Sequence, residues 1–81
     1  MARNDKLIAK LKAAKTMTWA DLVKALTVLG YQPVEGNGSR VKFDNGNPAQ
    51  LINLHRPHPD NEVKAYALRQ VRGKLKDWGY L

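Results

Sequence analysis

The sequence predicts a small α+β domain in which helices cover one face of an antiparallel sheet. Apolar residues recur at helical spacing in two N-terminal segments and one C-terminal segment, and they alternate with charged residues in between. Turn residues separate the alternating segments as in a three-stranded meander. A chain of 81 residues has room for one compact domain with a thin core. Any functional site is therefore expected to be a surface groove.

Two helices are expected first. Residues 5–14 place four apolar side chains on one helical face, with lysines off that face. The second helix begins after Thr18, a favourable N-cap residue with an aspartate three positions later, and ends at Gly30, where a left-handed conformation is expected. Residues 1–15 are thus predicted to be a helical extension of a core domain that spans residues 16–81.

Three strands and a third helix are expected next. The strands, of which the first contains a proline and is assigned to the sheet edge, are predicted at residues 31–35, 40–44 and 50–55. A glycine-rich segment at 36–39 has the composition of a hairpin turn. A stiff proline-rich connector then leads to a helix over residues 62–78, for which Asp60 or Asn61 is the expected cap.

The charge balance predicts a polyanionic partner. Lys and Arg number 14 against 7 Asp and Glu, which gives a formal charge of +7. Nucleic acid, an anionic membrane and an acidic protein can each bind such a basic surface. Few acidic residues lie among the basic ones, and this pattern favours nucleic acid as the partner. Tyr31, Tyr66 and Tyr80 are candidates for stacking on bases, whereas Trp19 and Trp78 are assigned to the core.

Composition also limits the class of protein. The chain has no cysteine, which excludes disulfides and thiolate zinc sites. Its N-terminal segment lacks the continuous apolar stretch of a signal peptide or membrane span. We therefore expect a cytoplasmic, soluble protein without a membrane partner.

Two histidines in one proline-rich loop, His55 and His58, are candidate catalytic residues. RNA cleavage without a metal needs a base for the ribose 2′-OH, an acid for the leaving 5′-oxygen and cations for the phosphorane. Histidine and arginine suit these roles near neutral pH. The candidate RNA-binding residues around the turn and the strand ends are Ser39, Arg40, Lys42 and Arg56.

Simpler explanations apply to each of these features. A surface histidine in such a loop often caps a helix or bonds a carbonyl, and the glycine-rich turn is also that of an ordinary hairpin. The two histidines with Asp60 make a weak metal-binding pattern. Phosphate-binding loop, dinucleotide-binding and Ser-His-Asp patterns are absent from the sequence. We therefore expect no metal and no small-molecule cofactor.

Several segments together resemble the HicA toxins of bacterial toxin-antitoxin systems, over roughly residues 16–81. The Gly-Ser turn, the proline-flanked histidine and the helix ending in glycine occur in the order and spacing of that family. The matching segments are residues 19–23, 29–31, 35–43, 55–59 and 78–81.

The resemblance implies a dsRBD-like fold, that of the double-stranded RNA-binding domain. This is an α-β-β-β-α two-layer sandwich with a three-stranded antiparallel sheet, preceded here by an extra N-terminal helix. HicA proteins are mRNA interferases that cleave RNA without a metal, and a HicB antitoxin neutralises each of them. Their catalytic histidine usually follows the Gly-Ser of the first hairpin, where this chain has Arg40. His58 matches the proline-flanked histidine of the family and His55 is additional, so a relocated catalytic pair is the resulting hypothesis.

The predicted function is an endoribonuclease toxin that cleaves mRNA and is neutralised by a HicB-type antitoxin. Two alternatives remain. One is a non-catalytic RNA-binding module with the same fold, and growth arrest on expression separates it from the toxin. The other is a protein-interaction domain whose basic surface binds an acidic partner, and salt-sensitive RNA binding would argue against it.

Overall fold

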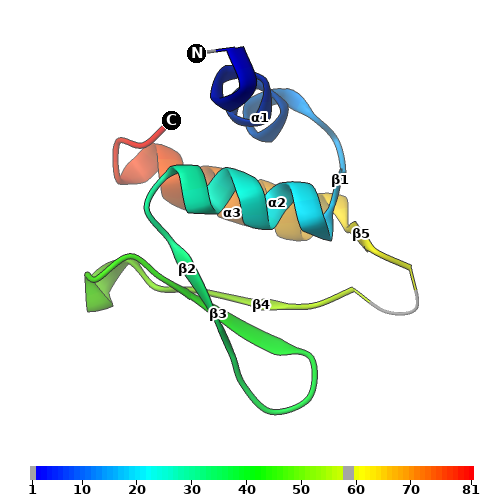
Figure 1. Cartoon of the computed structure of the whole chain (residues 1–81), viewed down its shortest axis with the longest axis vertical. Helices are drawn as coiled ribbons and strands as arrows, with labels where there is room; N and C mark the ends of the chain where they lie inside the picture. The colour runs from blue at the N-terminus through cyan, green and yellow to red at the C-terminus, as the bar shows by residue number, and fades with distance from the viewer. Residues whose placement is uncertain (1, 58–59) are drawn as a thin grey trace.

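Helices and strands follow the expected order in the computed structural model, which describes residues 2–57 and 60–81 (Figure 1). The α+β class and the two-layer arrangement with an additional N-terminal helix are confirmed. In chain order the segments are α1 (Ala2–Ala13), β1 (Met17–Thr18), α2 (Trp19–Val28), β2 (Gln32–Glu35), β3 (Arg40–Asp44), a 3₁₀ turn (Pro48–Gln50), β4 (Ile52–His55), β5 (Glu62–Val63) and α3 (Ala65–Asp77).

The main sheet is antiparallel, in the order β2-β3-β4. Its inner face is apolar, because every second residue of β3 and β4 is buried under the helices. The outer face is open and polar. The inner residues are Val41, Phe43, Ile52 and Leu54, and the outer ones are Arg40, Lys42, Asn53 and His55.

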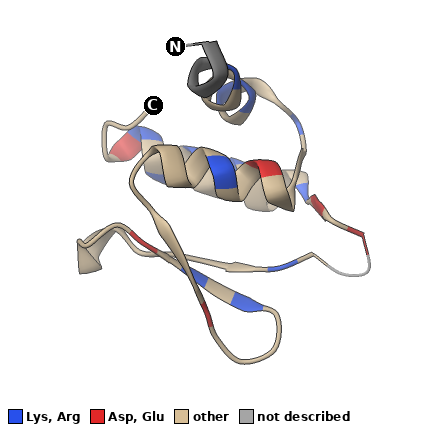
Figure 2. Cartoon of the chain, viewed as in Figure 1, with Lys and Arg blue, Asp and Glu red and all other residues tan. Residues whose placement is uncertain are grey.

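The helices α2 and α3 form the layer that covers the sheet, and the additional helix α1 lies on top of that layer (Figure 1). Between α1 and the sheet lie α2 and α3, and α1 contacts both of them on the side away from the strands. Leu11 of α1 is fully buried, as are Leu22 of α2 and Leu68 of α3, so the extension is part of the same core. Figure 2 places the cations of α1 and those of β3 on opposite sides of this helical layer. Among the described helices, none is long and apolar enough to cross a membrane.

The start of α2 follows the local sequence. Thr18 is the N-cap, and its Oγ1 accepts a hydrogen bond from the backbone N–H of Asp21 at 3.2 Å. The Asp21 carboxylate accepts a hydrogen bond from Lys10 of α1 at 2.7 Å, and this bond lowers the pKa of Asp21 below its ordinary value of 3.8. After the helix, Gly30 has a φ of 99°, as a left-handed terminating residue requires.

The start of α3 differs from the expectation. Glu62 and Val63 do not begin the helix but form β5, which pairs antiparallel with β1, so that Val63 lies opposite Met17. Both of these apolar residues are buried, and the backbone N–H of Trp19 donates to the carbonyl of Asn61 at 2.6 Å. The helix begins at Ala65 and has no side-chain cap, so the expected caps at Asp60 and Asn61 were wrong. The β1–β5 pair ties the start of α3 to the start of α2.

The third strand is shorter than expected. Residues 48–50 form a 3₁₀ turn whose N-cap, Asn47, accepts a hydrogen bond from the backbone N–H of Ala49, and β4 begins at Ile52. A proline at the first position of a helical turn is favourable, which explains why Pro48 begins this turn. The last residue of the strand, His55, is as predicted.

Tyr31 is a core residue, so its assignment as a base-stacking side chain was wrong. Only 1% of its surface is exposed, and its hydroxyl donates a hydrogen bond to the carbonyl of Gln50 at 2.9 Å. Its burial raises the pKa of the phenol above the ordinary value of 10.0. Tyr80 packs edge-on against its ring, and Tyr66 is 59% exposed.

Arg72 of α3 holds α1 in place. Its Nε donates to the carbonyl of Leu11 at 2.9 Å, and its Nη2 donates to the carbonyl of Ala14. Carbonyls at the C-terminal end of a helix lack intrahelical partners and carry partial negative charge, so a guanidinium is stabilising there.

We expect Arg72→Met to lower the free energy of unfolding by about 1–2 kcal/mol, because two hydrogen bonds from a cation are lost. Urea denaturation monitored by circular dichroism measures the change. Arg69→Met is the matched control, since Arg69 is exposed on the same helix. Equal midpoints for the two variants would show that Arg72 does not anchor α1.

Candidate functional site

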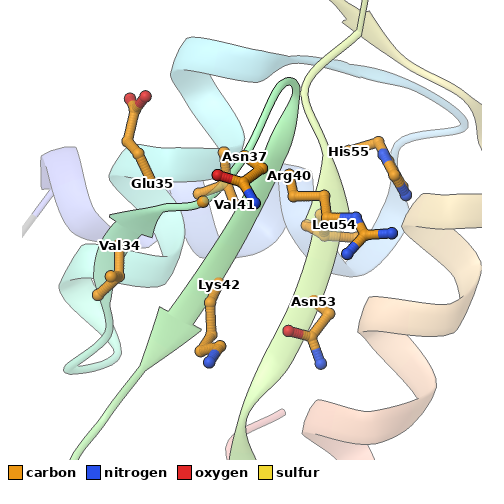
Figure 3. Close-up of a pocket in the computed structure, with 10 residues that line it drawn as sticks. Val34, Glu35, Asn37, Arg40, Val41, Lys42, Asn53, Leu54 and His55 are labelled. Atoms are coloured by element: carbon orange, nitrogen blue, oxygen red, sulfur yellow. The ribbon is translucent and has the colours of Figure 1, made fainter.

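A groove of about 440 Å³ lies on the outer face of the sheet (Figure 3). We call it the sheet groove. The hairpin turn between β2 and β3 closes one end of it, and side chains of all three strands form its floor and walls. Its lining residues are Val34, Glu35, Gly36, Asn37, Arg40, Val41, Lys42, Asn53, Leu54 and His55.

Arg40 and His55 lie directly opposite each other on neighbouring strands. The backbone N–H of Arg56 donates to the carbonyl of Ser39 at 2.7 Å, so residues 39 and 56 form a hydrogen-bonded pair. Hydrogen-bonded and non-hydrogen-bonded pairs alternate in an antiparallel ladder, so Arg40 and His55 form a non-hydrogen-bonded pair, in which side chains stand closest. The ladder therefore places Arg40 and His55 next to each other on the outer face of the sheet.

The same ladder positions a second cation. Lys42 lies opposite Asn53, again as a non-hydrogen-bonded pair. Figure 3 shows Lys42 and Asn53 next to each other and the Arg40 side chain extending toward β4. Two cations at alternate positions of one strand suit a phosphate or a phosphate backbone.

Ser39 contacts the imidazole. Its Oγ lies 3.4 Å from Nδ1 of His55, at the long end of hydrogen-bonding distance. When the hydroxyl donates to Nδ1, the ring proton is on Nε2; when Nδ1–H donates to the hydroxyl, Nε2 is a free acceptor. In either tautomer the contact orients the ring and leaves Nε2 for a substrate.

Arg56 lies at the end of β4 beside the hairpin turn, where its backbone N–H bonds to Ser39. Its guanidinium forms an ion pair with Glu35 at the ends of β4 and β2. Both side chains are largely exposed, so this pair contributes little to stability. Arg56 thus pairs with the carboxylate that lines the sheet groove, and the part of the chain that the structure describes shows no ion pair to Arg40 or Lys42.

His58, the proposed partner of His55, lies outside the described residues. Within residues 2–57 and 60–81, His, Cys, Asp and Glu form no group of three that could hold a metal ion. Sequence reasoning missed Asn53, which faces Lys42 across the ladder. Its only signal is its position two residues before His55, which puts both side chains on one face of a strand.

A small α+β domain with a cationic groove over its sheet is suited to binding a polyanion. The family model described as HicA toxin of bacterial toxin-antitoxin matches residues 19–80. The chain therefore belongs to the HicA toxin family, whose members work with an antitoxin and bind RNA. Comparisons with curated proteins and with solved structures gave no match.

Proposed function

We propose that this protein is a metal-independent endoribonuclease that cleaves mRNA in the cytoplasm and is neutralised by a HicB-type antitoxin. The observation that carries the proposal is the Arg40–His55 pair in the sheet groove, with Ser39 against the imidazole. The groove brings together a proton-transfer group and cations for a phosphate.

The chemistry uses the RNA itself as nucleophile. A base removes the proton of the ribose 2′-OH, the 2′-oxygen attacks the adjacent phosphorus, and the bond from phosphorus to the 5′-oxygen breaks as an acid protonates that oxygen. Arg40 and Lys42 stabilise the charge that develops on the phosphorane oxygens. His55 supplies one proton-transfer group and His58 the other. The products carry a 2′,3′-cyclic phosphate and a 5′-hydroxyl.

The family resemblance supports this arrangement. The usual catalytic histidine of HicA toxins follows the Gly-Ser of the hairpin, which is position 40 here. In this chain arginine occupies position 40, and the residue directly opposite on β4 is His55. An imidazole therefore remains in the same groove, one strand away from its usual place, and a phosphate-binding cation stands where the histidine would be.

One observation favours the second candidate, a non-catalytic RNA-binding module. Arg40 and Lys42 provide phosphate contacts that need no proton transfer, and arginine at position 40 replaces the residue that the family uses for chemistry. Such a module would bind RNA with the same salt dependence but would leave it intact.

Expression in a bacterium separates the two candidates. We expect the wild-type protein to arrest growth and degrade total RNA, and the double variant His55→Ala/His58→Ala to do neither while it accumulates to the same level. Purified wild-type protein should cleave RNA in EDTA, and its products should have 5′-hydroxyl ends. If RNA stays intact with both proteins, the non-catalytic binding module is the remaining candidate. Products with 5′-phosphate ends would contradict the proposed mechanism.

A further inference from the structure

A second groove, of about 230 Å³, meets the sheet groove at β4. We call it the edge groove. It lies between β4 and the first turns of α3, and Asn53 and His55 line both grooves. Side chains from α2 and α3 that also line it include Trp19, Tyr66 and Gln70. A ligand in one groove can therefore continue into the other past His55.

The two grooves differ in charge. Arg40 and Lys42 line the sheet groove. In the edge groove, Arg56 is paired with Glu35, and Lys64 lines the groove together with the carboxylates of Asp60 and Glu62. Carboxylates repel phosphate, whereas they accept hydrogen bonds from the amino groups of bases. The charge pattern thus favours a phosphate in the sheet groove and a neutral, hydrogen-bonding group in the edge groove.

The edge of β4 offers hydrogen-bonding groups to such a ligand. β4 is the last strand of the sheet, and its inward-facing backbone groups belong to Ile52, Leu54 and Arg56. By the same alternation, the N–H and C=O groups of Asn53 and His55 point out from the sheet at the edge groove. Tyr66, 59% exposed, supplies an aromatic face to the same groove.

We propose that the edge groove binds one unstacked nucleobase of single-stranded RNA, next to the phosphate held in the sheet groove. This proposal rests on the proposed function and names its substrate class. Tyr66 stacks on the base, and the edge of β4 with Gln70 bonds its polar rim. In an A-form duplex the bases are paired and stacked, so a duplex cannot fill the edge groove even though the fold resembles a double-stranded RNA-binding domain.

The test compares the binding of a short 2′-O-methyl oligoribonucleotide, which lacks the nucleophile, alone and annealed to its complement. We expect Tyr66→Ala to weaken single-strand binding by about tenfold and to leave duplex binding unchanged. Tyr66→Phe is the matched control, because it keeps the stacking face and should retain affinity. Lys42→Met should weaken the binding of both the single strand and the duplex, since it removes a phosphate contact. Circular dichroism verifies that each variant is folded.

Tryptophan fluorescence gives a second readout. The chain has two tryptophans, and Trp78→Phe leaves Trp19 in the edge groove as the sole tryptophan. We expect the single strand to quench its emission and inorganic phosphate to leave it unchanged. Equal losses for single strand and duplex in Tyr66→Ala, or no loss, would overturn the base-binding proposal alone. If neither ligand binds the wild type in a salt-dependent manner, the proposed function fails as well.

Discussion

Replacing His55 with alanine is expected to lower the rate of RNA cleavage by about 10²- to 10⁴-fold, the usual contribution of a general acid or base. The imidazole lies in the sheet groove beside Arg40, with Nδ1 held against Ser39. Its side chain is exposed and outside the core, so the variant should fold as the wild type does. Single-turnover cleavage of a defined oligonucleotide measures the effect on the chemical step.

The control for this variant is Gln32→Ala. Gln32 is exposed on β2, outside the lining of the sheet groove, and it pairs with Asp44 at the far end of β3 from Arg40. We expect it to cleave at the wild-type rate. A His55→Ala rate close to that of this control would show that the imidazole of His55 takes no part in proton transfer.

Much of the fold was predictable because local residues determine it. Thr18 caps α2, Gly30 ends it, and the alternation from Arg40 to Asp44 sets the two faces of β3. Each of these features depends on residues within a few positions of one another. Side-chain hydrogen bonds and backbone sterics act at that range, and they leave a clear pattern in the sequence.

The β1–β5 pair was not predictable in the same way. Two residues are too few to show a period, and what holds the strands together is the burial of Met17 and Val63, which are distant in sequence. The same limit applies to Arg72. A charge pattern cannot distinguish a cation in solvent from one that bonds the carbonyls of Leu11 and Ala14.

The candidate site was predictable by residue but not by geometry. Arg40, Lys42 and His55 follow from residue type and position, yet which of them face each other depends on strand register. The expected start of the third strand at residue 50 does not determine which of its residues pair with those of the second strand. The hairpin and the bond between Arg56 and Ser39 fix that register in the structure, and they make His55 the partner of Arg40.

Exchanging the two partners tests whether this pairing is the basis of activity. The variant His55→Arg alone loses the imidazole of the sheet groove and should be as impaired as His55→Ala. Adding Arg40→His returns an imidazole to the groove on the neighbouring strand, at the position of the usual family histidine, whose Cα lies about 4.5 Å from that of residue 55 in a non-hydrogen-bonded pair. We therefore expect the exchanged protein to cleave RNA at least about tenfold faster than His55→Arg.

The comparison is a double-mutant cycle, so its outcome depends on coupling between the two positions and not on either residue alone. The variant Arg40→His completes the cycle and should lose affinity for RNA, because the guanidinium that we propose to contact phosphate is removed while His55 remains. If the exchanged protein is no faster than His55→Arg, the groove does not accept proton transfer from position 40, and His55 has a role of its own. Recovery of cleavage would instead show that one imidazole and one cation, on either strand of the pair, are what this groove needs.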